Sequence, residues 1–130
     1  SKLQWTTLCN DPVMKPICEM IFKLPCEFER VHFMKLAAGK SLRKHTDNID
    51  IDIERKKIVR LHIPIRTNKD VVFTIYENAE DDIGKELNLM TGRYYYLDVT
   101  KPHSVSNNSD IDRYHLVVDC FVNEALNTML

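Results

Sequence analysis

The sequence predicts a mainly β protein built as a jelly roll, with one short helix near its N-terminus. Residues 28–122 contain about eight short segments rich in branched and aromatic side chains, separated by turn residues. No helical stretch long enough to connect parallel strands lies among these segments, so antiparallel pairing is expected. Short antiparallel strands in this number are typical of a jelly roll.

Length and composition indicate a single domain of 130 residues, with a helical cover over residues 1–27 and a β-barrel core over residues 28–122. Lys plus Arg (18) nearly balance Asp plus Glu (19), so a nucleic-acid partner is not expected. No apolar run approaches the roughly 20 residues that span a bilayer, so no membrane partner is expected either.

The four cysteines, at positions 9, 18, 26 and 120, form no C-x-x-C pair and lack the spacing of a zinc site. They are interpreted as reduced thiols that fill the core, because a chain of this length does not need disulfides. A cytoplasmic location is therefore predicted.

The helix is predicted to begin after Asn10 and Asp11, with Pro12 at its first position. Apolar residues then recur at spacings of three and four as far as Leu24, before Pro25 ends the helix. Such an apolar stripe would cover the outside of a sheet.

Strands are predicted from the alternation of side chains along the chain and from turn residues such as Gly39 and Gly92. Residues 48–57 also alternate, and they are interpreted as an exposed strand or hairpin arm with a solvated acidic face. The other predicted strands are residues 28–36, 42–47, 57–66, 71–76, 86–90, 94–99, 103–105 and 114–122.

Three residues form a candidate metal site. His45 and Asp47 are two positions apart, so on a strand their side chains share one face. His103 follows Pro102 at the start of a later strand, and the two strand ends could meet at one mouth of a barrel. Two imidazoles and one carboxylate are the ligands of non-haem Fe(II) oxygenases. The alternatives are a surface histidine beside an aspartate and, for His103, a turn histidine bonded to its own loop.

Arg113 opens an alternating strand that places it on one face together with His115 and Asp119. A guanidinium inside a barrel needs an anion, which is either an internal carboxylate or the carboxylate of a substrate or cosubstrate. Arg60 and His62 share a face in the same way and indicate a polar interior. His62 and His115 are interpreted as anion-binding groups or as residues that support the metal ligands.

Five segments together resemble the successive motifs of the aspartyl/asparaginyl β-hydroxylase family, which includes bacterial proline hydroxylases. They are GKSLRKHTD, RLHIPIRTN, GRYYYLD, PHSVSN and RYHLVVD, at residues 39–47, 60–68, 92–98, 102–107 and 113–119. The resemblance implies a cupin-like double-stranded β-helix and an Fe(II)- and 2-oxoglutarate-dependent dioxygenase.

By that resemblance His45, Asp47 and His103 would bind the iron, and Arg113 would hold the distal carboxylate of 2-oxoglutarate. Arg60 and His62 would bind either the cosubstrate or the substrate. The implied reaction uses O₂ to hydroxylate a C–H bond of an amino acid, with succinate and CO₂ as coproducts. The amino acid would be free, such as proline, or an aspartyl or asparaginyl residue in a peptide.

Two other classes of protein remain open from the residues alone. The first is a cupin-like protein that binds a metal and a small acid without catalysis. The second is a structural domain whose histidines are ordinary core or turn residues.

Overall fold

The computed structural model describes residues 10–47 and 57–129. The chain forms two compact units. Glu27–Val122 forms the larger unit, and the described residues of Ser1–Cys26 and Asn123–Leu130 form the smaller one. The division lies one residue from the predicted boundary between residues 1–27 and 28–122. The role of the helix as a cover for a sheet stays a prediction.

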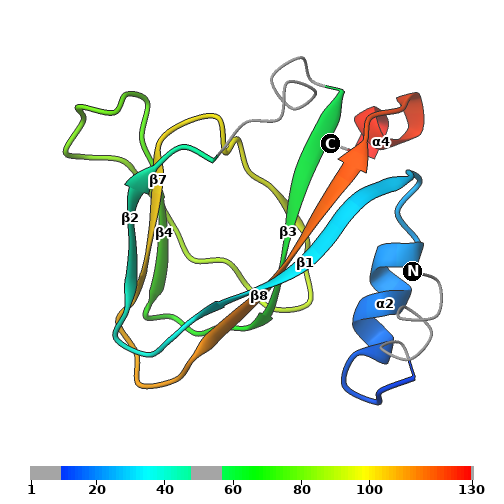
Figure 1. Ribbon diagram of the computed structural model, residues 1–130, viewed down its shortest axis with the longest axis horizontal. Coiled ribbons are helices and arrows are strands. Elements are labelled where there is room, and N and C mark those ends of the chain that lie inside the picture. Colours follow the sequence, from blue (N-terminus) through cyan, green and yellow to red (C-terminus); the bar gives the residue numbers. More distant parts are fainter. Residues whose placement is uncertain (1–9, 48–56, 130) are drawn as a thin grey trace. The chain divides into compact units, whose positions relative to one another are not determined.

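The larger unit contains two four-stranded antiparallel sheets that lie opposite one another (Figure 1). The first sheet has the strand order β1-β8-β3-β6, and the second has the order β2-β7-β4-β5. This arrangement confirms the predicted mainly β, cupin-like jelly roll. The strands are β1 (Phe28–Leu36), β2 (Ser41–His45), β3 (Ile58–Arg66), β4 (Val71–Ile75), β5 (Lys85–Leu87), β6 (Tyr95–Tyr96), β7 (His103–Asn107) and β8 (Arg113–Phe121).

Most strand bounds lie within two residues of those predicted, and β1 matches its prediction at both ends. β6 is much shorter than the predicted residues 94–99, because the backbone turns after it. In that turn the Val99 N–H bonds to the Leu97 carbonyl, and Asp98 accepts hydrogen bonds from the backbone and side chain of Thr100. The predicted exposed arm at residues 48–57 lies, except for its last residue, outside the described part of the chain.

β8 is one of the two inner strands of the first sheet. It pairs with β1 along one edge and with β3 along the other, and it is buried along most of its length. In an antiparallel pair, residues directly opposite each other project to the same side of the sheet. The register therefore sets which side chains of β1, β3 and β8 meet inside the barrel.

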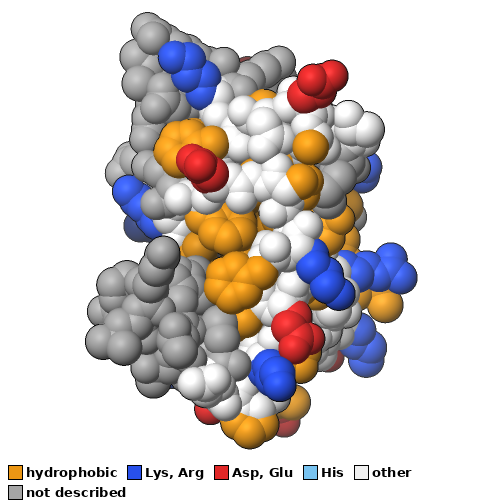
Figure 2. Space-filling view, turned by 90° about the vertical axis from the view of Figure 1, so that its right-hand side faces the viewer, with side chains coloured by type: hydrophobic (Ala, Val, Ile, Leu, Met, Phe, Trp, Pro, Cys, Tyr) orange, Lys and Arg blue, Asp and Glu red, His pale blue; other side chains and the backbone are white. Residues whose placement is uncertain are grey.

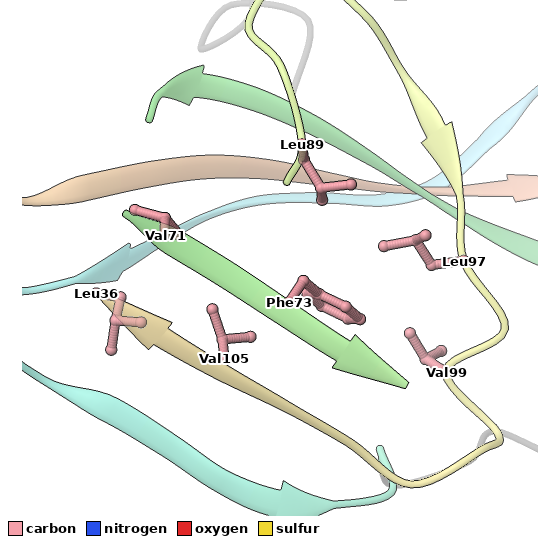
Figure 3. Close-up of a cluster of buried hydrophobic side chains, with 7 residues drawn as sticks. All are labelled: Leu36, Val71, Phe73, Leu89, Leu97, Val99 and Val105. Atoms are coloured by element: carbon pink, nitrogen blue, oxygen red, sulfur yellow. The ribbon is translucent and has the colours of Figure 1, made fainter. Parts of the chain in front are cut away.

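A cluster of buried hydrophobic side chains fills one part of the β unit (Figure 3). Phe73 of β4 lies in the middle of the cluster, and its side chain is only 5% exposed. The other members come from β1, β4, β7 and the loops on either side of β6, and they are Leu36, Val71, Leu89, Leu97, Val99 and Val105. Through Val105 the cluster includes β7, the strand that begins at His103.

The turn between β7 and β8 is held by Asn107, which is 1% exposed. Its amide nitrogen donates to the carbonyls of Leu36 (3.0 Å) and Ile111 (2.9 Å), and its amide oxygen accepts from Ser109. These bonds fix the backbone that leads into Arg113 at the start of β8. The predicted turn at Gly39, where φ is 73°, lies beside it and donates to the Ser109 carbonyl.

The smaller unit contains helix α2 (Lys15–Phe22) and helix α4 (Glu124–Met129). The predicted start of the first helix at Pro12 is wrong: Asp11 accepts bonds from the backbone of Val13 and Met14 in a turn, and the helix begins with Pro16 in its first positions. Helix α4 was not predicted, although Asn123 caps it by accepting a bond from the Leu126 N–H.

The prediction of four reduced cysteines is wrong for Cys18, which is disulfide-bonded. Disulfides are rare in cytosolic proteins, so this bond argues against the predicted cytoplasmic location, which stays a prediction. Neither described helix is long and apolar enough to cross a bilayer. Basic and acidic side chains are scattered among hydrophobic ones on the face shown in Figure 2.

Replacing Phe73 by alanine should destabilise the protein by about 3–5 kcal/mol, because the change leaves a cavity among buried side chains. Urea denaturation measures the free energy of unfolding. Phe33→Ala is the matched control, since Phe33 is 46% exposed and should cost much less. Equal losses for the two variants would show that the cluster around Phe73 is not the main core of the β unit.

Candidate metal site and pocket

The three predicted metal ligands come together at one end of the second sheet. His45, the last residue of β2, is the direct antiparallel partner of His103, the first residue of β7. Asp47 follows two residues beyond the end of β2. One ligand atom from each of the three lies within 4.8 Å of the others. The sheet register therefore produces the grouping predicted from residue type and spacing.

Both histidines present the same ring nitrogen to this group. The Nδ1 of His45 lies 2.6 Å from the Arg43 carbonyl, and the Nδ1 of His103 lies 2.9 Å from the Lys101 carbonyl. A carbonyl can only accept, so Nδ1 carries the proton in each ring and Nε2 faces Asp47. Metal-bound histidines are usually oriented by such a bond from the other nitrogen. The three residues therefore fit a metal ion.

His103 is held more firmly than His45. Its side chain is 5% exposed, and its ring stacks on that of Phe73 with centroids 5.5 Å apart and an interplanar angle of 8°. The side chain of His45 is 41% exposed. Phe73 therefore connects the hydrophobic core directly to one candidate ligand.

Asp47 and His103 form an ion pair in the structure, with Oδ1 and Nε2 3.0 Å apart. Partial burial disfavours the charged form of each side chain. The contact between the two, together with their other partners, has the larger combined effect on both pKa values. The pKa of Asp47 falls to about 2, helped by Arg60, and the pKa of His103 is raised, helped also by the Lys101 carbonyl. The carboxylate is thus ionised at neutral pH, as a metal ligand must be.

The candidate ligands line a pocket with a volume of about 460 Å³ between the inner faces of the two sheets. A pocket of this size can hold small organic molecules. Its wall is rich in cationic and imidazole groups, and Asp47 is the acidic residue in its lining. Strands of the first sheet contribute Arg30, His32, Met34, Arg60, His62, Arg113, His115 and Val117.

Arg60 is bonded to two carboxylates. Its Nε and Nη2 donate to the two oxygens of Asp119, at 2.7 and 3.0 Å, and its Nη1 donates to Oδ2 of Asp47 at 2.5 Å. The contact with Asp119 is the main cause of the raised pKa of the guanidinium. Asp119 is 1% exposed, so Arg60 supplies the countercharge that a buried carboxylate requires.

Arg113 is buried in a different way. It is 3% exposed, and its Nε has no hydrogen-bond partner among the described residues. No ion pair joins it to a carboxylate of the described chain, and burial lowers its pKa to about 10. Asp119, which shares the inward face of β8 with Arg113, pairs with Arg60.

Two buried histidines lie near each other in the pocket, with the ring centroids of His62 and His115 6.3 Å apart. Burial lowers the pKa of His62 to about 4. Burial, with a contribution from Arg113, lowers the pKa of His115 to about 3. Both rings are therefore neutral at physiological pH, and Nε2 of His62 lacks a partner among the described residues.

All six residues predicted for the site, together with His115, line this one pocket. The roles assigned to them as iron ligands or anion-binding groups stay predictions. Residues of the site that were not assigned a role from sequence include Arg30, His32, Phe73 and Asp119. The sequence indicated that Asp119 faces inward, because it shares one face of β8 with Arg113. Its partner could not be predicted, because the partner depends on the sheet register.

Fold and site together define a cupin-like jelly-roll protein with a candidate metal site of two histidines and one carboxylate. The profile of the aspartyl/asparaginyl β-hydroxylase family matches residues 7–122. The chain therefore belongs to this family, which confirms the resemblance seen in its motifs. Among curated proteins, none matches the sequence at a significant level.

One solved structure shows a similar fold. A nickel complex of the non-heme monooxygenase ThoJ is similar with a TM-score of 0.54 and 15% identity, over 71% of this chain and 42% of that one. This chain therefore spans less than half the length of ThoJ. Weaker similarities include a predicted oxalate decarboxylase from Thermotoga maritima (TM-score 0.46, 19% identity, 80% and 73% coverage) and a cupin 2 conserved barrel domain protein from Salinispora arenicola (0.43, 14%, 75% and 66%).

The buried histidines should make the protein less stable in acid. Above pH 6.5 His62 and His115 are neutral in both the folded and the unfolded protein. As the pH falls below 6.5, the unfolded chain takes up protons that the folded protein excludes, down to about pH 4 for His62 and about pH 3 for His115. Each should lower the free energy of unfolding by roughly 1.4 kcal/mol per pH unit in that window.

Urea denaturation in chelator between pH 7 and pH 5 measures this slope. The variant His62→Gln/His115→Gln should lose less stability than the wild type over the same range. The difference between the two proteins isolates these residues from His103, whose raised pKa acts in the opposite direction. Identical slopes would mean that the two rings do not remain neutral in the folded protein.

Loss of a residue that only hydrogen-bonds to a metal ligand weakens metal binding by roughly 10–100-fold. Replacing His103 by alanine removes a candidate ligand itself, so Mn(II) binding should weaken by more than this. Isothermal titration calorimetry measures the affinity. His32→Ala is the matched control: His32 lines the same pocket but lies outside the group of three, so its loss should change the affinity less than threefold. Full Mn(II) affinity in His103→Ala would rule out this ligand assignment.

Proposed function

We propose that the protein is an Fe(II)- and 2-oxoglutarate-dependent dioxygenase that hydroxylates a C–H bond of an amino acid, with O₂ as oxidant and succinate and CO₂ as coproducts. Membership of a hydroxylase family supports an oxygenase. The observation that carries the 2-oxoglutarate assignment is Arg113, a buried guanidinium without a carboxylate partner among the described residues, in the same pocket as the metal ligands.

Arg113 selects an anion. A buried cation without a countercharge costs several kcal/mol, so its place in the pocket indicates a ligand that brings a carboxylate. Arginine binds carboxylates through two parallel hydrogen bonds, and Nε is one of the donors of that fork. A 2-oxo dicarboxylic acid fits both requirements, since one end can meet the metal while the distal carboxylate meets Arg113.

The candidate ligands would hold Fe(II) through Nε2 of His45, Nε2 of His103 and an oxygen of Asp47. Such a triad leaves three coordination positions for the cosubstrate and O₂, and bound iron supplies the activation of O₂. The chain itself binds and orients the reactants. Arg113 fixes the cosubstrate, and the apolar side chains of Phe73 and Val117 exclude water from the wall.

The substrate we propose carries a carboxylate of its own. Arg30 and His32 of β1 line the pocket and are not needed for either role described above. Arg30, together with Arg60 and Arg113, gives a wall whose cationic groups outnumber its one acidic residue. A free amino acid such as proline, or an aspartyl side chain in a peptide, would meet this wall with an anionic group.

An anaerobic titration of the apo-protein with Fe(II) and then 2-oxoglutarate tests the proposal. Chelation should give a visible charge-transfer band, and admission of O₂ should yield succinate. Arg113→Met should keep Fe(II) affinity and lower 2-oxoglutarate affinity by about 10–100-fold, since one charge-assisted interaction is worth about 1.5–3 kcal/mol. The matched control is Arg66→Met, at an exposed arginine on β3.

The outcomes separate the classes of protein. Metal binding without a charge-transfer band or succinate would indicate a cupin-like protein that binds a small acid without catalysis. Absence of metal binding in the folded protein would indicate a structural domain. Equal loss of 2-oxoglutarate affinity in Arg66→Met would remove the argument from Arg113.

A further inference from the structure

We propose that Asp119 and Arg60 are positioning residues for the metal site: Asp119 holds Arg60, and Arg60 holds Asp47 so that only one of its oxygens faces the metal. The inference rests on the proposed metal site. In this proposal Arg60 has a role in addition to the anion binding expected from the sequence. Asp119, to which the sequence analysis assigned no role, gains one.

The arrangement begins with the register of the first sheet. Arg60 of β3 and Asp119 of β8 are direct partners in the antiparallel ladder, so their side chains project to the same side. Two parallel bonds join them, from Nε to Oδ1 and from Nη2 to Oδ2. Asp119 is 1% exposed, and this fork fixes the plane of the guanidinium.

The remaining nitrogen of the guanidinium is directed at the candidate metal ligand. Nη1 donates to Oδ2 of Asp47 at 2.5 Å. The other oxygen, Oδ1, lies 3.0 Å from Nε2 of His103 and 3.5 Å from Nε2 of His45. The carboxylate is therefore divided: one oxygen faces the arginine and the other faces the two imidazoles. Asp47 would occupy a single coordination position and leave the others open to small ligands.

Asp47 needs such support because the sheet does not orient it. It lies two residues beyond the end of β2, and its backbone N–H reaches the Val99 carbonyl only at 3.5 Å. A ligand that lies outside the hydrogen-bonded strands has conformational freedom, and this freedom would be lost when a metal binds. The bond to Arg60 removes part of that freedom in advance, as hydrogen-bonded outer partners do for metal-bound carboxylates.

The charges also suit a divalent ion. Asp47 and Asp119 are anionic and Arg60 is cationic, so the three side chains together carry a charge of −1. Replacing Asp119 by asparagine makes the sum zero and breaks the fork. Replacing Arg60 by methionine and Asp119 by leucine together keeps the sum at −1, because Asp47 alone remains charged. The double variant therefore tests positioning without a change of net charge.

The experiment is a titration of the full chain with Co(II), followed by its visible absorption and by calorimetry. In Arg60→Met/Asp119→Leu and in Asp119→Asn, Co(II) affinity should fall by roughly 10–100-fold, and the intensity of the absorption bands should change as the carboxylate becomes free to bind through both oxygens. Circular dichroism checks folding, and the double variant creates no new unpaired buried charge, because both members of the Arg60–Asp119 pair are removed. Asp70→Asn, at an exposed aspartate, is the control and should match the wild type.

Co(II) affinity and spectra within experimental error of the wild type in either folded variant would overturn the inference while leaving the proposed function in place. Wild-type Co(II) affinity combined with weakened 2-oxoglutarate binding would also overturn it, in favour of Arg60 as an anion-binding group only. If the wild-type protein binds no Co(II), the proposed function and this inference both fail.

Discussion

The antiparallel register between β3 and β8 is the constraint on which the rest of the pocket depends. It sets Arg60 opposite Asp119 and His62 opposite Val117, and it turns all four side chains to the interior of the barrel. A shift of one residue would send every one of them to the other face of the sheet. The polar residues inside the barrel therefore depend on the register of these strands. The hydrophobic residues on the opposite face of the same strands specify that same register.

Arg60 and Arg113, the first partly and the second fully buried, show how the protein distributes charge. Arg60 is neutralised within the chain by Asp119 and Asp47, whereas the described chain offers Arg113 no carboxylate. The first arrangement stabilises the site before any ligand arrives. The second leaves a guanidinium whose charge the carboxylate of the proposed cosubstrate would neutralise. The two arginines lie on the neighbouring strands β3 and β8.

Much of the fold could be predicted because segments rich in branched and aromatic side chains are separated by turn residues, as residues 28–36 of β1 are separated from the next strand by the turn at Gly39. The three candidate ligands could be chosen by residue type and spacing. The partner of Asp119 could not, because its bond to Arg60 joins residues 59 positions apart and follows from register alone. The helix start was misplaced because Pro12 and Pro16 both suit a first helical position, and only the turn formed by Asp11 distinguishes them.

The unequal exposure of the three candidate ligands has a consequence for how the site exchanges its ion. Exposed fractions fall from 41% for the side chain of His45 to 20% for Asp47 and 5% for His103. An ion that arrives from solvent meets His45 first and His103 last, and one that leaves follows the reverse order. In a site that holds a metal, rotation of the exposed imidazole of His45 would therefore open a path to solvent without separation of the sheets. The metal content of the protein would follow the supply of metal around it and would not be fixed when the chain folds.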